Sequence, residues 1–85
     1  MGYHVYVLKS LKNNRLYTGS THDIDKRLRE HQAGQSKATR YIRPFQLLLV
    51  ETYPTRSEAV RRERELKTGK GREEIQKKTA GFKGL

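Results

Sequence analysis

The apolar and polar pattern near the N-terminus predicts a β-hairpin. Residues 3–8, Tyr-His-Val-Tyr-Val-Leu, are rich in β-branched and aromatic side chains, as strands are. Alternation along a strand should place two triplets on opposite faces: Tyr3, Val5 and Val7, and His4, Tyr6 and Leu8. Asn13 and Asn14 suit a turn, so residues 15–18 should form the returning strand. We expect Gly19 to end that strand and to let the backbone turn.

After position 23 the pattern changes to the 3.6-residue period of a helix. One stripe at i, i+3, i+4 and i+7 consists of Ile24, Arg27, Leu28 and His31. Asp23 or Thr21 can cap the start of this helix, and Gly34 can end it. The stripe is only half apolar, because Arg27 and His31 are groups whose burial is costly without partners. We therefore expect this helix face to line a site as well as a core.

Residues 46–53 predict a third strand, whose unbroken apolar run suggests the centre of the sheet with both faces covered. Pro54 ends it. Residues 55–58, Thr-Arg-Ser-Glu, match a capping box, so a second helix should run from there to about Lys67. Within its apolar stripe of Ala59, Val60 and Leu66 lies one acid, Glu63. The glycine- and lysine-rich segment 68–85 should hold a short helix around residues 72–78.

The segment 35–45 has no clean period and reads as a basic loop with interleaved aromatic residues. Cations beside stackable rings suit a nucleic-acid backbone and unpaired bases, which makes Lys37, Arg40 and Arg43 candidate nucleic-acid contacts. The alternative is a solvated connecting loop with exposed cations, of which three residues pack into the core: Tyr41, Ile42 and Phe45.

Composition narrows the class of ligand. The 85 residues form one domain with a thin core, since only 33% of them are hydrophobic. With 19 basic and 9 acidic residues the formal net charge is +10, which attracts polyanions. We expect nucleic acid rather than membrane, because no apolar run approaches the roughly 20 residues of a span. The absence of cysteine excludes disulfides and thiolate metal sites, and it fits a reducing cytoplasm.

Periodicity points five chemically useful side chains inward: Tyr6, Tyr17, Arg27, His31 and Glu63. A single carboxylate can hold Mg²⁺ that keeps most of its waters, and a guanidinium can hold a phosphate. A phenol or an imidazole can orient or deprotonate water, so hydrolysis of a phosphodiester is the natural reaction class. The structural alternatives are that the tyrosines pack, that His31 caps a helix, and that Arg27 and Glu63 form an ion pair between two helices.

In these residues the chain resembles the GIY-YIG nuclease superfamily, and within it the small bacterial proteins of the UPF0213 group. The two name-giving motifs correspond to residues 4–6, His-Val-Tyr, and 17–19, Tyr-Thr-Gly. The helix signature corresponds to residues 27–31 and the metal-binding glutamate to Glu63, so the resemblance covers about residues 3–67. The chain departs from the pattern at His4, at Thr18, and in having no asparagine after Asn14.

The resemblance implies an α+β fold, with a central three-stranded antiparallel sheet flanked by helices. It also implies an endonuclease that cleaves DNA with one divalent metal, Mg²⁺ or Mn²⁺, bound by Glu63, in repair or processing. Tyr6 would act as base toward water, Tyr17 would assist it, and Arg27 would stabilise charge on the phosphate. His31 would hydrogen-bond in the same pocket. A phenol needs help to act as a base, because its ordinary pKa is near 10. We expect a cytoplasmic monomer whose targeting comes from a protein partner.

Two other functions remain open at this stage. One is a nucleic-acid-binding module of the same fold with little or no cleavage. The other is a docking module of a larger repair complex, which does not account for the inward Arg27 and Glu63. Both nucleic-acid functions predict an affinity that falls steeply with salt, whereas docking does not.

Overall fold

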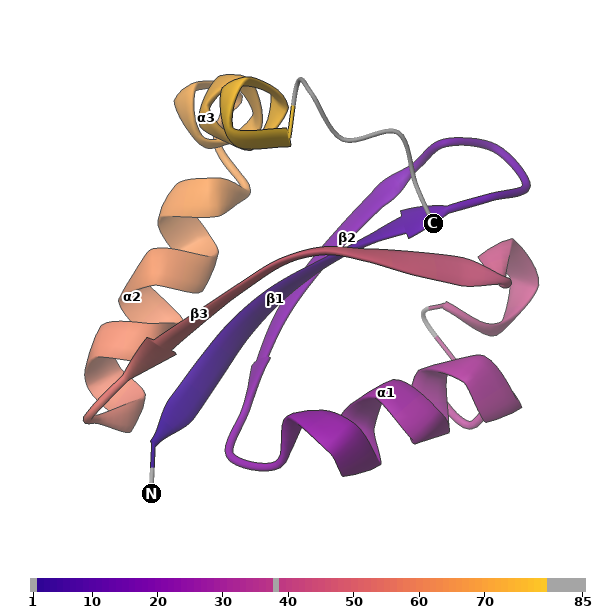
Figure 1. The fold of residues 1–85 in the computed structure, drawn as a ribbon, viewed down its shortest axis with the longest axis horizontal. Helices are drawn as coiled ribbons and strands as arrows, with labels where there is room; N and C mark the ends of the chain where they lie inside the picture. Colours follow the sequence, from indigo (N-terminus) through magenta and orange to yellow (C-terminus); the bar gives the residue numbers. More distant parts are fainter. Residues whose placement is uncertain (1, 38, 80–85) are drawn as a thin grey trace.

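A computed structural model describes residues 2–37 and 39–79. Three antiparallel strands form one sheet in the order β2-β1-β3, and three α-helices flank it, as expected for an α+β fold (Figure 1). The strands are β1 (Tyr3–Ser10), β2 (Leu16–Thr21) and β3 (Phe45–Tyr53). The helices are α1 (Ile24–Ala33), α2 (Arg56–Leu66), α3 (Gly69–Thr79) and the short 3₁₀ helix η1 (Arg40–Ile42).

The central strand is β1, so the prediction that the third strand lies at the sheet centre was wrong. Val7 pairs with Thr18 of β2 on one side and with Leu49 of β3 on the other, which leaves β3 at an edge. A register shift between Val7 and Leu8 interrupts the alternation of β3, and Leu48 and Leu49 both pack against the same apolar cluster. This irregularity explains an apolar run without requiring that both faces be covered.

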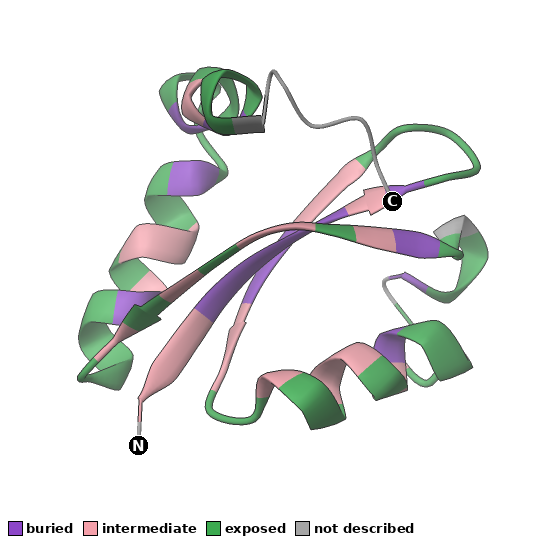
Figure 2. Ribbon diagram, in the orientation of Figure 1, coloured by how far each residue is buried: buried purple, intermediate pink, exposed green. Residues whose placement is uncertain are grey.

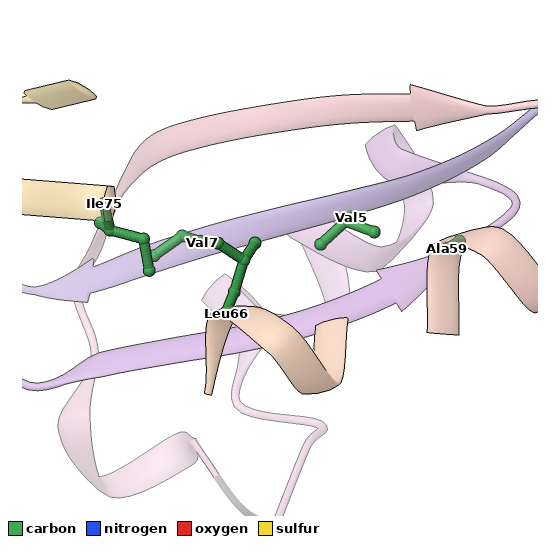
Figure 3. Close-up of a cluster of buried hydrophobic side chains, with 5 residues drawn as sticks. All are labelled: Val5, Val7, Ala59, Leu66 and Ile75. Atoms are coloured by element: carbon green, nitrogen blue, oxygen red, sulfur yellow. The ribbon is translucent and has the colours of Figure 1, made fainter. Parts of the chain in front are cut away.

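The helices cover opposite faces of the sheet, and this confirms the predicted alternation of β1. On one face, α2 and α3 bury a cluster with the sheet (Figure 3), made of Val5, Val7, Ala59, Leu66 and Ile75. On the other face, α1 contributes Ile24 and Leu28 to a smaller cluster around Tyr6, Leu8 and Phe45. Burial is therefore concentrated along β1, and the outer faces of the helices are exposed (Figure 2).

The returning strand is longer than predicted, and Gly19 lies inside it rather than at its end. Gly19 pairs with Tyr6 in the β1–β2 ladder. A Cβ atom at position 19 would lie 2.6 Å from the Tyr6 hydroxyl oxygen and 2.8 Å from Cζ of the same ring. The glycine is thus explained by the close approach of a phenol to the backbone. The hairpin turn itself includes Asn14, with a φ of 62°.

The predicted helix ends are confirmed for α1 and α2. The Asp23 carboxylate accepts from the backbone N–H of Lys26 at 3.1 Å, and Gly34 ends α1 in the left-handed region at φ 80°. The Thr55 hydroxyl accepts from the backbone N–H of Glu58 at 3.3 Å, which caps α2.

The third helix is longer than the predicted range of 72–78. It follows α2 after a tight connection, where a Cβ on Gly71 would overlap backbone atoms of Glu65 and Leu66. The close contact between the two helices at this point therefore depends on glycine. Residues 80–85 of the basic C-terminal segment lie outside the described residues.

An ionic cluster ties β3 to α2 and α3. The Arg62 guanidinium donates to Glu51 at 2.8 Å and also pairs with Glu74, while Lys78 donates to Glu51 at 3.1 Å. The hydrogen bonds from Arg62, Tyr53 and Lys78 outweigh burial and lower the pKa of Glu51 to about 2. This carboxylate is a structural anchor on the face covered by α2 and α3.

Candidate active site

A buried hydrogen-bonded chain links the sheet, α1 and the loop after it. The Tyr6 hydroxyl lies 2.9 Å from Nε2 of His31, and Nδ1 of the same imidazole lies 2.8 Å from the Thr39 hydroxyl. All three side chains are almost fully buried, with exposures of 1% for Tyr6 and 0% for His31 and Thr39. Both imidazole nitrogens are thus satisfied, as buried polar atoms generally are.

The surroundings favour the neutral form of both the His31 imidazole and the Tyr6 phenol. Burial lowers the pKa of His31, and the positive charge of Arg27 lowers it further. Burial also raises the pKa of Tyr6 to about 12, although the nearby Arg27 guanidinium opposes the rise. At neutral pH the site therefore holds a protonated phenol against an uncharged imidazole.

Tyr17, on β2, packs beside this chain on the α1 face of the sheet. Its ring centroid lies 5.1 Å from that of His31 and 6.3 Å from that of Tyr6, both in tilted or edge-on geometry. Phe45, at the start of β3, meets His31 edge-on at 6.0 Å. Tyr17 is partly exposed whereas Tyr6 is not, so Tyr17 is the phenol nearer the surface.

Arg27 lies one turn before His31 on α1, as the stripe predicts. Its guanidinium donates to Glu30 at 3.1 Å and interacts with the Tyr6 phenol, which is the leading cause of the raised pKa of Arg27. About a third of the Arg27 side chain is exposed. A permanently charged group thus lies between the buried phenol and solvent, where an anion could reach it.

Glu63 approaches from the opposite helix layer, on α2. Its carboxylate accepts from the Ser20 hydroxyl of β2 at 2.7 Å and from Lys67 at 2.8 Å. Burial alone would raise the pKa of Glu63, but the hydrogen bonds from Lys67 and Ser20 and the nearby positive charges hold it below its ordinary value. The carboxylate is therefore ionised at neutral pH, and its charge contributes to the raised pKa of Tyr6.

Arg27 and Glu63 have separate partners, so the structural alternative of an ion pair between them was wrong. Arg27 pairs with Glu30 on its own helix, and Glu63 pairs with Lys67 on its own helix. The two groups come from helices on opposite faces of the sheet and act on the same phenol. The charges of Arg27 and Glu63 are therefore not paired with each other.

The donor set for a metal is small. Within the residues that the structure describes, no three His, Asp or Glu side chains form a metal-binding group. Glu63 alone, ionised and 20% exposed, fits a hard cation that keeps most of its waters and takes a phosphate oxygen as a further ligand. A closed cage of protein ligands would not fit this site.

The basic loop is divided between exposed cations and internal contacts. Lys37, Arg40 and Arg43 are all exposed. Arg43 also donates to the carbonyls of Arg40 and Gln32, and Arg40 lies 4.8 Å over the ring of Tyr41, which is 70% exposed. Phe45 packs into the core, and the side chain of Ile42 lies outside the described part of the loop.

Three residues of the site were missed by reasoning from sequence. Thr39 lies in a segment without periodicity, and no sequence signal marks it as the partner of His31. Ser20 shares the α2 face of β2 by alternation, a signal that was available, and it reaches Glu63. Lys67 is four residues beyond Glu63, the usual spacing of a helical ion pair.

The fold and the site together define a small domain with two neighbouring phenols, an arginine–histidine helix and an opposing glutamate. The family profile described as the GIY-YIG catalytic domain matches residues 2–78. The chain belongs to the GIY-YIG family, a nuclease superfamily whose domains generally bind nucleic acid and use a divalent metal.

Proteins with the UPF0213 name are among its relatives. The UPF0213 protein of Staphylococcus saprophyticus is 45% identical over 67 residues, which cover 78% of this chain and 80% of that protein. A UPF0213 protein of Haloquadratum walsbyi is 43% identical over 67 residues, covering 78% and 75%. The solution NMR structure of a UPF0213 protein from Bacillus halodurans matches with a TM-score of 0.55 and 34% identity, over 99% of this chain and 87% of that one.

Among residues 2–37 and 39–79, none of the helices has the length and apolar character needed to cross a bilayer.

Proposed function

We propose that this chain is an endonuclease that hydrolyses DNA phosphodiester bonds with a single divalent metal at Glu63. The observation that supports it best is the 2.9 Å hydrogen bond between Tyr6 and a buried, neutral His31. That pair supplies what a phenol base lacks by itself, a group that takes its proton. We place the activity in DNA repair or processing.

The proton path follows from the hydrogen bonds. In the tautomer that carries its proton on Nδ1 and donates it to Thr39, Nε2 of His31 accepts the Tyr6 proton. As Tyr6 takes a proton from the attacking water, its own proton passes to Nε2, so water becomes the nucleophile and imidazole becomes imidazolium. No free phenolate is needed, which suits a phenol with a pKa of about 12.

The remaining residues hold and neutralise the phosphate. Arg27 can donate to two phosphate oxygens and stays charged at every working pH. Tyr17, the more exposed phenol, can donate to a third oxygen or to the water. Glu63 would hold Mg²⁺ or Mn²⁺, which when bound would polarise a phosphate oxygen and neutralise developing charge.

The test is cleavage of labelled single-stranded, double-stranded and branched DNAs with Mg²⁺, Mn²⁺ or EDTA. We expect nicking that needs the metal. Its rate should fall about 100-fold or more in Tyr6→Phe, which removes the proton relay from Tyr6 to His31 but keeps the ring. Tyr41→Phe is the matched control, because Tyr41 is 70% exposed and takes no part in the proposed proton transfer. Equal activity in both variants contradicts the proposal.

A second function is supported by the depth of the relay. Tyr6 is 1% exposed and His31 is 0% exposed, as expected if both residues serve to hold α1 against the sheet. The chain would then be a nucleic-acid-binding module of the same fold. Its signature is salt-sensitive binding of every DNA in the panel with no nicking in either metal.

A further inference from the structure

Three hollows follow the full length of β2 on the side of α2 and α3. The first, of about 440 Å³, is lined by Asn14, Arg15, Leu16, Arg72 and Gln76. The second, of about 300 Å³, shares Leu16 and Arg72 with it and extends to Tyr17, Thr18, Lys67 and Ile75. The third, of about 350 Å³, lies at the other end of β2, beside Ser20, Thr21, His22 and Arg56.

The lining of these hollows has one sign of charge. Four of the residues that line the three hollows are basic: Arg15, Arg56, Lys67 and Arg72. No described lining residue of these hollows is acidic. The hollow on the outer face of α2 and the one between α2 and α3 both include Glu65, so acids do line hollows elsewhere on the molecule. The series along β2 is therefore selectively positive.

Most of these cations are available to a ligand. Arg15, Arg56 and Arg72 are exposed, and within the described residues their side chains form no ion pair. By contrast, the exposed Arg40 and Arg43 of the loop after α1 already make contacts within the protein. Guanidinium groups without partners favour a phosphate ligand.

The candidate active site interrupts the series. The Ser20–Glu63 hydrogen bond joins β2 to α2 between the second and third hollows, since Thr18 lines the second and Ser20 lines the third. Tyr17 and Lys67, which belong to or touch the site, line the second hollow. Positive hollows thus lie on both sides of Glu63.

We propose that these hollows form one binding track for the phosphodiester backbone of a nucleic-acid strand, with the strand crossing Glu63 between Arg56 at one end and Arg72 and Arg15 at the other. The passage of the strand over Glu63 matters for cleavage only if the proposed function holds. Binding of the strand in the track does not depend on it. Six residues of β2 at about 3.3 Å each span about 20 Å. The track is long enough for several successive phosphates.

The test is the salt dependence of binding to a fluorescein-labelled single-stranded oligonucleotide in EDTA, where no metal-dependent cleavage occurs. The track variant is Arg15→Ala with Arg56→Ala and Arg72→Ala. The control variant is Arg29→Ala with Arg61→Ala and Lys77→Ala, three exposed cations that line none of the three hollows. Both variants lower the formal charge of +10 by three, so general attraction is matched.

Each phosphate contact contributes about 0.7 to the slope of log Kobs against log salt for a single strand, so the track variant should lose about 2 from the slope. The control variant should keep the parent slope, and both should keep the parent's thermal midpoint. Equal slopes for the two variants overturn the proposal. Binding to phosphatidylserine vesicles is measured alongside. A track variant that loses binding to the vesicles but keeps binding to the oligonucleotide also overturns the proposal. Failure of the parent to cut DNA would overturn the proposed function and leave this result standing.

Discussion

The Thr39 hydroxyl lies 2.8 Å from Nδ1 of His31, and both side chains are completely buried. When Nδ1 carries the ring proton and donates it to Thr39, Nε2 is left to accept from Tyr6. The contact also ties the loop after α1 to the helix, since Thr39 precedes η1.

Thr39→Val should destabilise the protein by about 1–3 kcal/mol, because it leaves a buried imidazole nitrogen without a partner while keeping the shape of the side chain. Urea unfolding measures the loss. Thr52→Val is the matched control, since Thr52 makes the same kind of bond to His4, at 2.9 Å, in an exposed position. A similar loss of unfolding free energy in both variants would show that the buried hydrogen bond to His31 stabilises the protein no more than the exposed one to His4.

Gly19→Ala should cost about 1–3 kcal/mol, because the new Cβ would lie 2.6 Å from the hydroxyl of a buried Tyr6 ring. Gly69→Ala is the control, since a Cβ there meets nothing within 4 Å. Thermal unfolding of the two variants measures the difference. If Gly19→Ala is as stable as Gly69→Ala, the phenol does not lie against this backbone.

The stability of the protein should rise with pH in the range just below 6.5. The pKa of His31 is lowered in the folded state, so the unfolded chain binds the proton more readily and stability is lost as pH falls below the ordinary value of 6.5. The free energy of unfolding measured between pH 7.5 and 5 should therefore slope upward with pH. His31→Gln should flatten the slope, and His22→Gln, at an exposed position, should leave it unchanged.

A second, more acidic transition should come from Glu51. Its pKa of about 2 lies below the ordinary 4.5, so its contribution is complete above pH 4.5 and is lost as pH falls toward 2. Each unit of that difference is worth about 1.4 kcal/mol, which makes the contribution on the order of 3 kcal/mol. Glu51→Gln should remove it at neutral pH, whereas Glu73→Gln, at an exposed position, should change unfolding little.

Much of the fold could be predicted from local pattern. The faces of β1, the cap at Asp23 and the capped start of α2 depend on neighbours in sequence, and each is confirmed. The position of β3 was not predictable in this way, because an irregular strand can bring consecutive leucines to one face. Sheet order depends on pairing between distant residues, which periodicity does not record.

The candidate site shows the same division. Periodicity pointed Tyr6, Tyr17 and His31 inward, and the structure places them in contact. Thr39 was beyond reach, because its position depends on how a loop without a period returns to α1. The role of Gly19 was misread as a turn, because the cause is a side chain of another strand.

Glu63 is proposed to hold the metal of a phosphodiester hydrolase. The most direct measurement is the nicking rate of one labelled DNA with Mn²⁺, in the parent, in Glu63→Ala and in Glu65→Ala, with DNA affinity measured separately in EDTA. Glu65 is the matched control, as a more exposed acid two residues away on the same helix. We expect the nicking rate to fall about 100-fold or more in Glu63→Ala alone, with DNA affinity retained. Nicking by Glu63→Ala at the parent rate would contradict this proposal.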